Sequence, residues 1–310
     1  MRKFLRYFEL RANARWLAAL VLGLAVGSAV AAVEFPAAGN DDSHITFWAA
    51  HALATHGSIL NYNGAHVEQS SSFTLVWLLA AAHRLGLPIP ATAWGLGIAF
   101  AVAAVVVASS LGRRLHERAG AITALLLATS LPFAYWATSG MEASLTALLG
   151  TLLIVVSGKA IEERWPLRDG RRLGTIVLML AFALVRPETP LVLGCTLAGT
   201  TLFYLLRSRR ARGPEERERV RSCALELALA ALVVGVVFGG RYLAFHAFVP
   251  NSALAKVGGF RLSAGGDYLW KGLLATNPLL AAVAVVGGVL AVRDARDGRA
   301  GPQNLLLVSF

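Results

Sequence analysis

The chain alternates long apolar segments with short arginine-rich loops, and this alternation limits the folds open to it. With 56% hydrophobic and only 15% charged residues, a soluble domain of this size could not bury its apolar surface, whereas a bilayer accepts it. We therefore predict an all-α fold, a polytopic transmembrane helical bundle that forms a single domain over residues 1–310. The predicted apolar runs are 73–87, 91–111, 120–137, 143–158, 173–185, 190–206, 223–243, 273–292 and 303 onward.

The net charge of +11 comes almost entirely from arginines between the apolar segments. A charge of this size is also found in nucleic-acid-binding proteins, but cations in short loops are typical of the cytoplasmic side of a membrane protein. We therefore expect membrane lipids as the surroundings, no nucleic acid as a partner, and the loops 112–118, 159–172 and 207–221 in the cytoplasm.

The amino-terminal end predicts the direction of the first crossing. The basic segment Met1–Arg15 leads into an apolar run, Trp16–Val33, which reads as an uncleaved first helix with a cytoplasmic amino terminus. Residues 36–72 then form the first extracytoplasmic loop. A conflict follows, because the segment between Asp41 outside and Arg113 inside must cross an odd number of times, yet it holds two apolar runs. The first run, 73–87, is short, and the sequence leaves open whether it spans.

Two shorter features interrupt the pattern of spans. Residues 42–56 read as a short amphipathic helix that lies at the membrane interface and ends at Gly57. The runs 173–185 and 190–206 are joined only by Arg186–Thr189, which predicts a hairpin with charged residues at membrane depth. The chain ends part-way into a further apolar run, and we expect it to be carboxy-terminally incomplete.

The acidic pair Asp41-Asp42 is the sharpest chemical signal. It stands at the start of the interfacial helix, where the helix dipole favours ionised carboxylates. An ionised carboxylate here could act as a general base toward a hydroxyl, or bind a divalent cation together with the partner carboxylate and His44. The alternative is that one of the two aspartates only caps the helix.

Other charged residues on the predicted outer side are candidates for substrate binding. Glu68 and Glu142 could bind hydroxyls, or could be a solvated loop charge and a favourable charge at a helix start. Arg186 suits an anionic phosphate, with Glu188 beside it, and the alternative is a structural ion pair. Lys256 is a further phosphate candidate, although its ammonium group could equally extend to the membrane surface.

Five segments together resemble bacterial GT-C glycosyltransferases, and in particular the actinobacterial terminal β-arabinofuranosyltransferases and their uncharacterised relatives. In chain order the segments are Asp41-Asp-Ser-His-Ile-Thr-Phe47, Gly57-Ser-Ile-Leu-Asn-Tyr-Asn-Gly-Ala-His-Val-Glu-Gln-Ser-Ser-Ser72, Thr138-Ser-Gly-Met-Glu142, Leu184-Val-Arg-Pro-Glu188 and Pro250-Asn-Ser-Ala-Leu-Ala-Lys256. The resemblance runs from about residue 16 to 260. No P-loop, G-x-G-x-x-G, G-x-S-x-G or H-E-x-x-H motif competes with it.

This resemblance implies a glycosyltransferase in the bacterial plasma membrane whose active cavity opens to the outside. The implied donor is a polyprenyl-phosphate sugar, with arabinofuranose as one candidate, and the acceptor is a cell-envelope glycan or lipid. Asp41 or Asp42 would be the catalytic base, and Glu68, His66 and Glu142 would line the cavity. Arg186, Glu188 and Lys256 would stand near the donor phosphate.

The chain departs from these relatives at two places. They often carry an arginine in the interfacial helix where this chain has Phe47-Trp48, and often read Gly-Glu-Arg-Val-Glu where it has Gly64-Ala-His-Val-Glu68. These losses of charge leave the donor sugar open. Two other classes of function also stay open on the sequence alone, a polytopic transporter or lipid flippase and a non-catalytic assembly protein.

Overall fold

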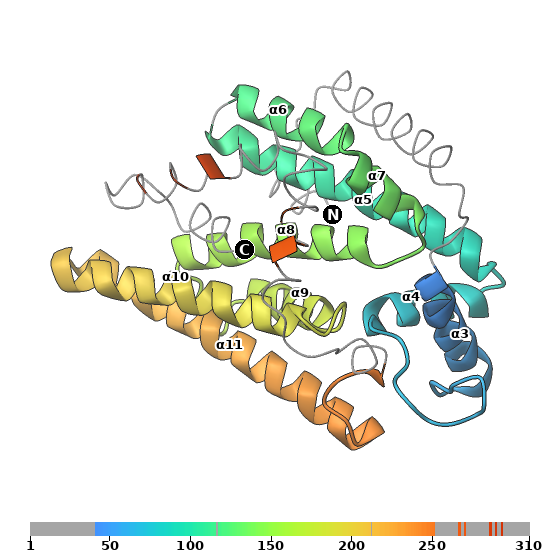
Figure 1. Ribbon diagram of the computed structural model, residues 1–310. Coiled ribbons are helices and arrows are strands. Elements are labelled where there is room, and N and C mark those ends of the chain that lie inside the picture. Colours follow the sequence, from blue (N-terminus) through green and yellow to red (C-terminus); the bar gives the residue numbers. More distant parts are fainter. Residues whose placement is uncertain are drawn as a thin grey trace. The chain divides into compact units, whose positions relative to one another are not determined.

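The computed structural model describes residues 41–115, 117–211 and 213–251, together with the isolated positions 266, 267, 270, 285, 286, 289 and 293. The predicted first helix Trp16–Val33, the candidate Lys256 and the last two apolar runs lie outside the described residues. Within the described residues every regular element is a helix, which confirms the all-α prediction (Figure 1).

Four of the described helices are long and apolar enough to cross a bilayer. They are α5 (Ile89–Leu115), α8 (Ala143–Glu162), α10 (Thr189–Ala211) and α11 (Pro214–Phe245). A bent pair, α6 (Glu117–Ala128) and α7 (Leu131–Thr138), adds a fifth candidate span. Backbone groups that enter hydrocarbon must be paired within their own segment, and helices of about 20 residues achieve this. The chain is therefore a multi-pass membrane protein.

The described chain separates into two compact units, Met1–Thr151 and Leu152–Phe310, with the division inside α8. The first unit contains α3 (Asp41–His56), α4 (Phe73–Arg84), α5, α6, α7 and the start of α8. The second contains the end of α8, α9 (Arg171–Ala183), α10 and α11.

In the first unit α6 and α7 run along α5 (Figure 1). Small residues allow this close approach, and their shared core is Ala101, Val105, Ala124, Ala128 and Ala137. The predicted apolar run 120–137 does not form one straight helix, because the helix breaks after Ala128 and turns by 61°. Ser130 is extended, and Pro132, which has no backbone N–H to donate, stands at the start of α7.

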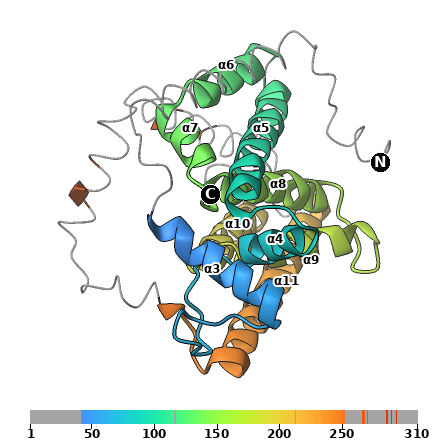
Figure 2. The same cartoon turned by 90° about the vertical axis from the view of Figure 1, so that its right-hand side faces the viewer.

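The helices α3 and α4 form a second contact pair in this unit, visible in Figure 2. The predicted helix over 42–56 is confirmed as Asp41–His56, and Gly57 ends it with a φ of +73°. The following loop contains the expected turn, in which the Gly64 N–H donates to the Asn61 carbonyl over 2.9 Å. The 12 residues of α4 rise only about 18 Å, which is too short to span. Between Asp41 and Arg113, only α5 is long enough to cross the membrane. A single crossing is the odd number of crossings that the charge pattern requires.

A glycine packs the loop between α7 and α8 onto α3. Gly140 has a φ of +75°, and a Cβ atom built on it would lie 2.8 Å from Cζ of Phe47. Phe47 is buried at this contact. The Thr138–Glu142 segment is therefore held against α3 by a close approach that only a residue without a side chain allows.

In the second unit α9 and α10 form the predicted hairpin, and α10 packs beside α11 (Figure 1). Thr189 closes the hairpin turn, because its hydroxyl donates to the carbonyls of Phe182 and Arg186. The expected cytoplasmic loop over 207–221 is wrong as a loop, since α10 continues to Ala211 and α11 already begins at Pro214. Proline at a helix start and the acidic pair in the first turn both favour this early beginning.

The second unit contains a fully buried ion pair. Arg172, at the start of α9, donates to the carboxylate of Glu226 in α11, and both side chains are at most 2% exposed. The second terminal nitrogen of Arg172 donates to the Trp165 carbonyl over 2.5 Å. Nearby, the Ser222 hydroxyl donates to the Ala160 carbonyl at the end of α8. The predicted loop 159–172 therefore ends in a buried cation, Arg172, which joins α9 to α11.

The neighbouring Arg171 shows the solvated arrangement. It pairs with Asp169 at 2.8 Å and Glu163 at 2.7 Å, and about half of its side chain is exposed. The Trp165 indole N–H and then Arg171 hold the pKa of Glu163 below its ordinary value, and the hydrogen bond from Arg171 lowers that of Asp169. Both carboxylates therefore stay ionised at neutral pH, in contact with water.

Replacing Gly140 with alanine should lower thermal stability. The new Cβ would meet the Phe47 ring in a left-handed backbone conformation, at a cost of roughly 1–3 kcal/mol. Gly95→Ala in α5 is the matched control, because nothing lies within 4 Å of its Cβ position. Melting temperatures of the purified proteins in detergent decide the point. Equal melting temperatures for the two variants would contradict the contact.

Removing one partner of the buried pair should be far more damaging than removing its exposed neighbour. Arg172→Met leaves the Glu226 carboxylate buried without its counter-charge, at a cost of roughly 3–5 kcal/mol. Arg171→Met, one residue away, removes only solvated contacts and should change stability little. Denaturation in detergent compares the two, and a double variant Arg172→Met/Glu226→Met should recover part of the loss. Similar losses for both single variants would refute the distinction.

Candidate functional site

The acidic pair forms the first turn of α3, as the sequence predicts. Asp41 is exposed and Asp42 is partly buried. At 100° per residue the two side chains leave the helix on different faces. Asp41 shares its face with residues three, seven and ten positions later, whereas Asp42 lies on the side of Thr46 and Ala49, which are buried. Asp41 is therefore the carboxylate with open space before it.

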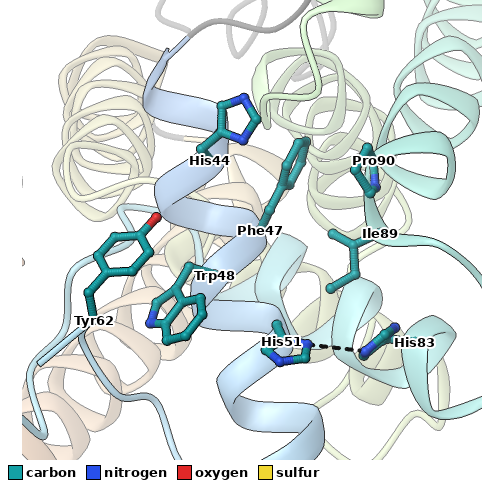
Figure 3. A pocket seen from close by; sticks show the side chains of 8 residues that line it. All are labelled: His44, Phe47, Trp48, His51, Tyr62, His83, Ile89 and Pro90. Atoms are coloured by element: carbon teal, nitrogen blue, oxygen red, sulfur yellow. Dashed lines mark hydrogen bonds between the residues drawn. The ribbon is translucent and has the colours of Figure 1, made fainter. Parts of the chain in front are cut away.

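The face below Asp41 carries a row of ring side chains, His44, Trp48 and His51. These rings line an open pocket of about 400 Å³ together with Phe47, Tyr62, His83, Ile89 and Pro90 (Figure 3). All of these residues belong to the first unit, and the pocket size lies in the ordinary range for small-molecule sites. The pocket thus begins one helical turn from Asp41.

Hydrogen bonds hold the aromatic wall of this pocket in place. The Trp48 indole N–H donates over 2.9 Å to the Leu60 carbonyl, which also accepts from the Gln69 side chain. The Trp48 and Tyr62 rings are stacked, with centroids 4.7 Å apart and planes 25° from parallel. With its only polar atom already satisfied, Trp48 presents an apolar ring face.

A pair of histidines continues the pocket lining beside Trp48, since the ring centroids of Trp48 and His51 lie 5.7 Å apart. His51 Nδ1 lies 3.2 Å from His83 Nε2, and His83 Nδ1 lies 3.4 Å from the Leu87 carbonyl (Figure 3). Because a carbonyl only accepts, His83 Nδ1 is the donor toward Leu87, and in the bond between the two imidazoles one nitrogen donates and the other accepts. His51 Nε2 takes part in neither of these two contacts.

Glu68 and Glu142 are placed differently from the expectation that they line an open cavity. Glu68 is 3% exposed and Glu142 is 0% exposed, so both lie in the interior of the first unit. The segment after Glu68 packs on the buried side of α3, where the Thr46 and Ser70 hydroxyls lie 3.0 Å apart. His66 is exposed in the same loop. The segments that carry both glutamates therefore contact the helix that carries Asp41, but from its buried side.

The predicted phosphate-binding residues belong to the other unit. Arg186 Nε donates to Glu188 at 2.5 Å, and the side chains are 37% and 54% exposed. The expected charged pair at the hairpin turn is thus present as a direct ion pair. This geometry agrees with the structural alternative and leaves part of the guanidinium accessible. Lys256 lies outside the described residues.

The candidate cation site is not assembled in the part of the chain that the structure describes. No group of three or more histidine, cysteine, aspartate or glutamate side chains there could hold a metal ion. The base role predicted for the carboxylates does not require such a site.

The sequence analysis missed the pocket. The spacing of Asp41, His44, Trp48 and His51 by three, four and three residues could have indicated one shared helix face. Nothing in the sequence pairs His83 with His51 or Tyr62 with Trp48, because those contacts join α3 to a second helix and to a loop.

No protein-family model matches this chain, and searches of the curated proteins and of the solved structures found no match. The function must therefore be argued from the residues and their geometry.

Proposed function

We propose that this protein is a membrane glycosyltransferase that moves a sugar from a polyprenyl-phosphate donor to a glycan or lipid acceptor. The bacterial plasma membrane is the proposed location, with the amino terminus in the cytoplasm and α3 on the outer side. The positive charge of the loops on the opposite side supports this orientation.

The proposed reaction is a displacement at the anomeric carbon of the donor sugar. A carboxylate at the start of α3 takes the proton of an acceptor hydroxyl, and the hydroxyl oxygen forms the new bond to the anomeric carbon. The bond from that carbon to the phosphate oxygen breaks, and polyprenyl phosphate leaves with the electron pair. Arg186 is the proposed contact for the phosphate charge, by resemblance.

One observation carries the proposal best. Asp41 is exposed at the positive end of the α3 dipole and stands one turn from an open pocket lined by rings. The dipole favours its ionised, proton-accepting form, and the neighbouring pocket offers space for an acceptor. A carboxylate that only caps the helix would need no such pocket.

Transport is the second candidate, and the break between α6 and α7 favours it. Broken helices at membrane depth are typical of transporters, where they surround the substrate. Protein in vesicles that moves a labelled lipid-linked sugar across the bilayer without forming product would support this alternative.

Asp41→Asn should lower transfer by about 10²–10⁴-fold, the usual contribution of a general base. Asp42→Asn should be milder, because Asp42 faces the buried side of α3. Glu215→Gln is the matched control, since Glu215 is also an exposed carboxylate in the first turn of a helix. Purified protein in nanodiscs, radiolabelled polyprenyl-phosphate sugars and a glycan acceptor provide the assay. Full activity of both aspartate variants would disprove the base assignment.

Variants of Arg186 and Glu188 distinguish donor-phosphate binding by Arg186 from a purely structural ion pair. If Arg186 binds the donor, Arg186→Gln should raise the KM for the donor by about tenfold or more, whereas Glu188→Gln should raise it far less. Lysine at position 186 should restore binding only partly, because it lacks the planar fork of donors. Steady-state kinetics with varied donor measure this. If both glutamine variants raise the KM equally and lower the melting temperature equally, Arg186 and Glu188 form only a structural ion pair.

A further inference from the structure

The proposed function uses the pocket beside α3 only as space for an acceptor and does not specify which acceptor fits there. Asp41, His44, Trp48 and His51 extend along one helix face over ten residues, a rise of about 15 Å. This strip of side chains is longer than a single hydroxyl acceptor needs. It begins at the proposed base and continues into the pocket of Figure 3.

The two walls of the pocket match different parts of one kind of molecule. The stacked rings of Trp48 and Tyr62 present apolar faces, which suit the C–H face of a sugar ring. Beside these rings, the hydrogen-bond chain from His51 through His83 to the Leu87 carbonyl uses only Nδ1 of His51 and leaves its Nε2 for a ligand. A sugar hydroxyl, which can donate or accept, is a complementary partner.

Other occupants fit this chemistry less well. A phosphate or carboxylate is usually held by arginine or lysine, and neither lines the pocket. A lipid acyl chain would cover the rings but would offer no hydrogen-bond partner to the His51 imidazole or the Tyr62 hydroxyl. A neutral, polyhydroxylated ring satisfies both walls.

We infer that this pocket binds a sugar ring of the acceptor, so that the acceptor is an oligosaccharide chain lying along α3 with its reacting hydroxyl at Asp41. This inference rests on the proposed function and adds the class of acceptor and the residues that hold it. The rigid wall favours binding, because Trp48 is already fixed by its bond to the Leu60 carbonyl and loses little freedom when a ligand arrives. Tyr62, which is 63% exposed, is the part of the wall most open to a ligand.

The test measures binding without any donor, so that it is independent of transfer. Wild-type protein in nanodiscs is titrated separately with arabino-, manno- and galacto-hexasaccharides, and binding is followed by saturation-transfer NMR and calorimetry. Tyr62→Ala and Trp48→Ala should raise the Kd of the hexasaccharide that binds by about tenfold or more. Trp77→Ala is the matched control, because Trp77 is a 62% exposed ring on α4 that lies outside the pocket.

A second variant series tests the imidazole of His51. His51→Phe keeps a ring but removes the hydrogen-bonding nitrogens, and should weaken binding, whereas Asp41→Asn should leave hexasaccharide binding within about threefold while lowering transfer by about 10²–10⁴-fold. Melting temperatures confirm that each variant is folded. If Trp48→Ala does not fold, Tyr62→Ala alone still tests whether the aromatic wall binds the sugar.

Three results would overturn the inference. They are equal hexasaccharide affinities in wild type and Tyr62→Ala, no binding of any hexasaccharide to wild type, and quenching of tryptophan fluorescence by brominated lipid tails that disappears in Trp48→Phe. In each case the glycosyltransfer assay with Asp41→Asn still tests the proposed function separately, because that assay does not require Tyr62 to bind a sugar.

Discussion

The absence of water in the bilayer core is the constraint on which this structure depends. A backbone N–H or C=O without a partner is costly in hydrocarbon, so each spanning segment satisfies its own groups as a helix. The four long helices α5, α8, α10 and α11 meet this requirement directly. Where a helix breaks, the backbone is protected locally. Thr189 donates to two carbonyls at the α9–α10 turn, and Ser130 and Pro132 mark the bend between α6 and α7.

The same constraint explains how the protein treats its buried charges. The Arg172–Glu226 pair is enclosed on both sides and takes a further hydrogen bond from Arg172 to the Trp165 carbonyl, because an isolated charge in that place would be untenable. Arg171, one position earlier, reaches solvent and meets two carboxylates there. Neighbouring residues of one type thus play opposite parts, according to the helix face on which they lie. A count of loop arginines treats both alike.

The candidate site shows which features can be predicted from residue spacing in the sequence and which cannot. The acidic pair, the helix that begins with it and the glycine that ends that helix are local features, governed by capping, dipole and backbone freedom, and the sequence indicated all three. The burial of Glu68 and Glu142 was not predicted, because it depends on packing against the hidden side of α3. The pocket was missed for the same reason. Its walls come from α3, α4, the start of α5 and the loop that carries Tyr62, and no spacing rule relates them.

By itself the sequence determined that the chain is helical, that it crosses a membrane several times and that acidic residues begin a short helix after the first segment. Those features follow from composition and from interactions within a few residues, for which apolar run length and charge placement are sufficient. Tertiary structure decided which of two adjacent aspartates has open space before it, which arginine is buried and which rings meet across a pocket. Each of these depends on which face of a helix is covered by a distant segment, and that is set only when the helices pack.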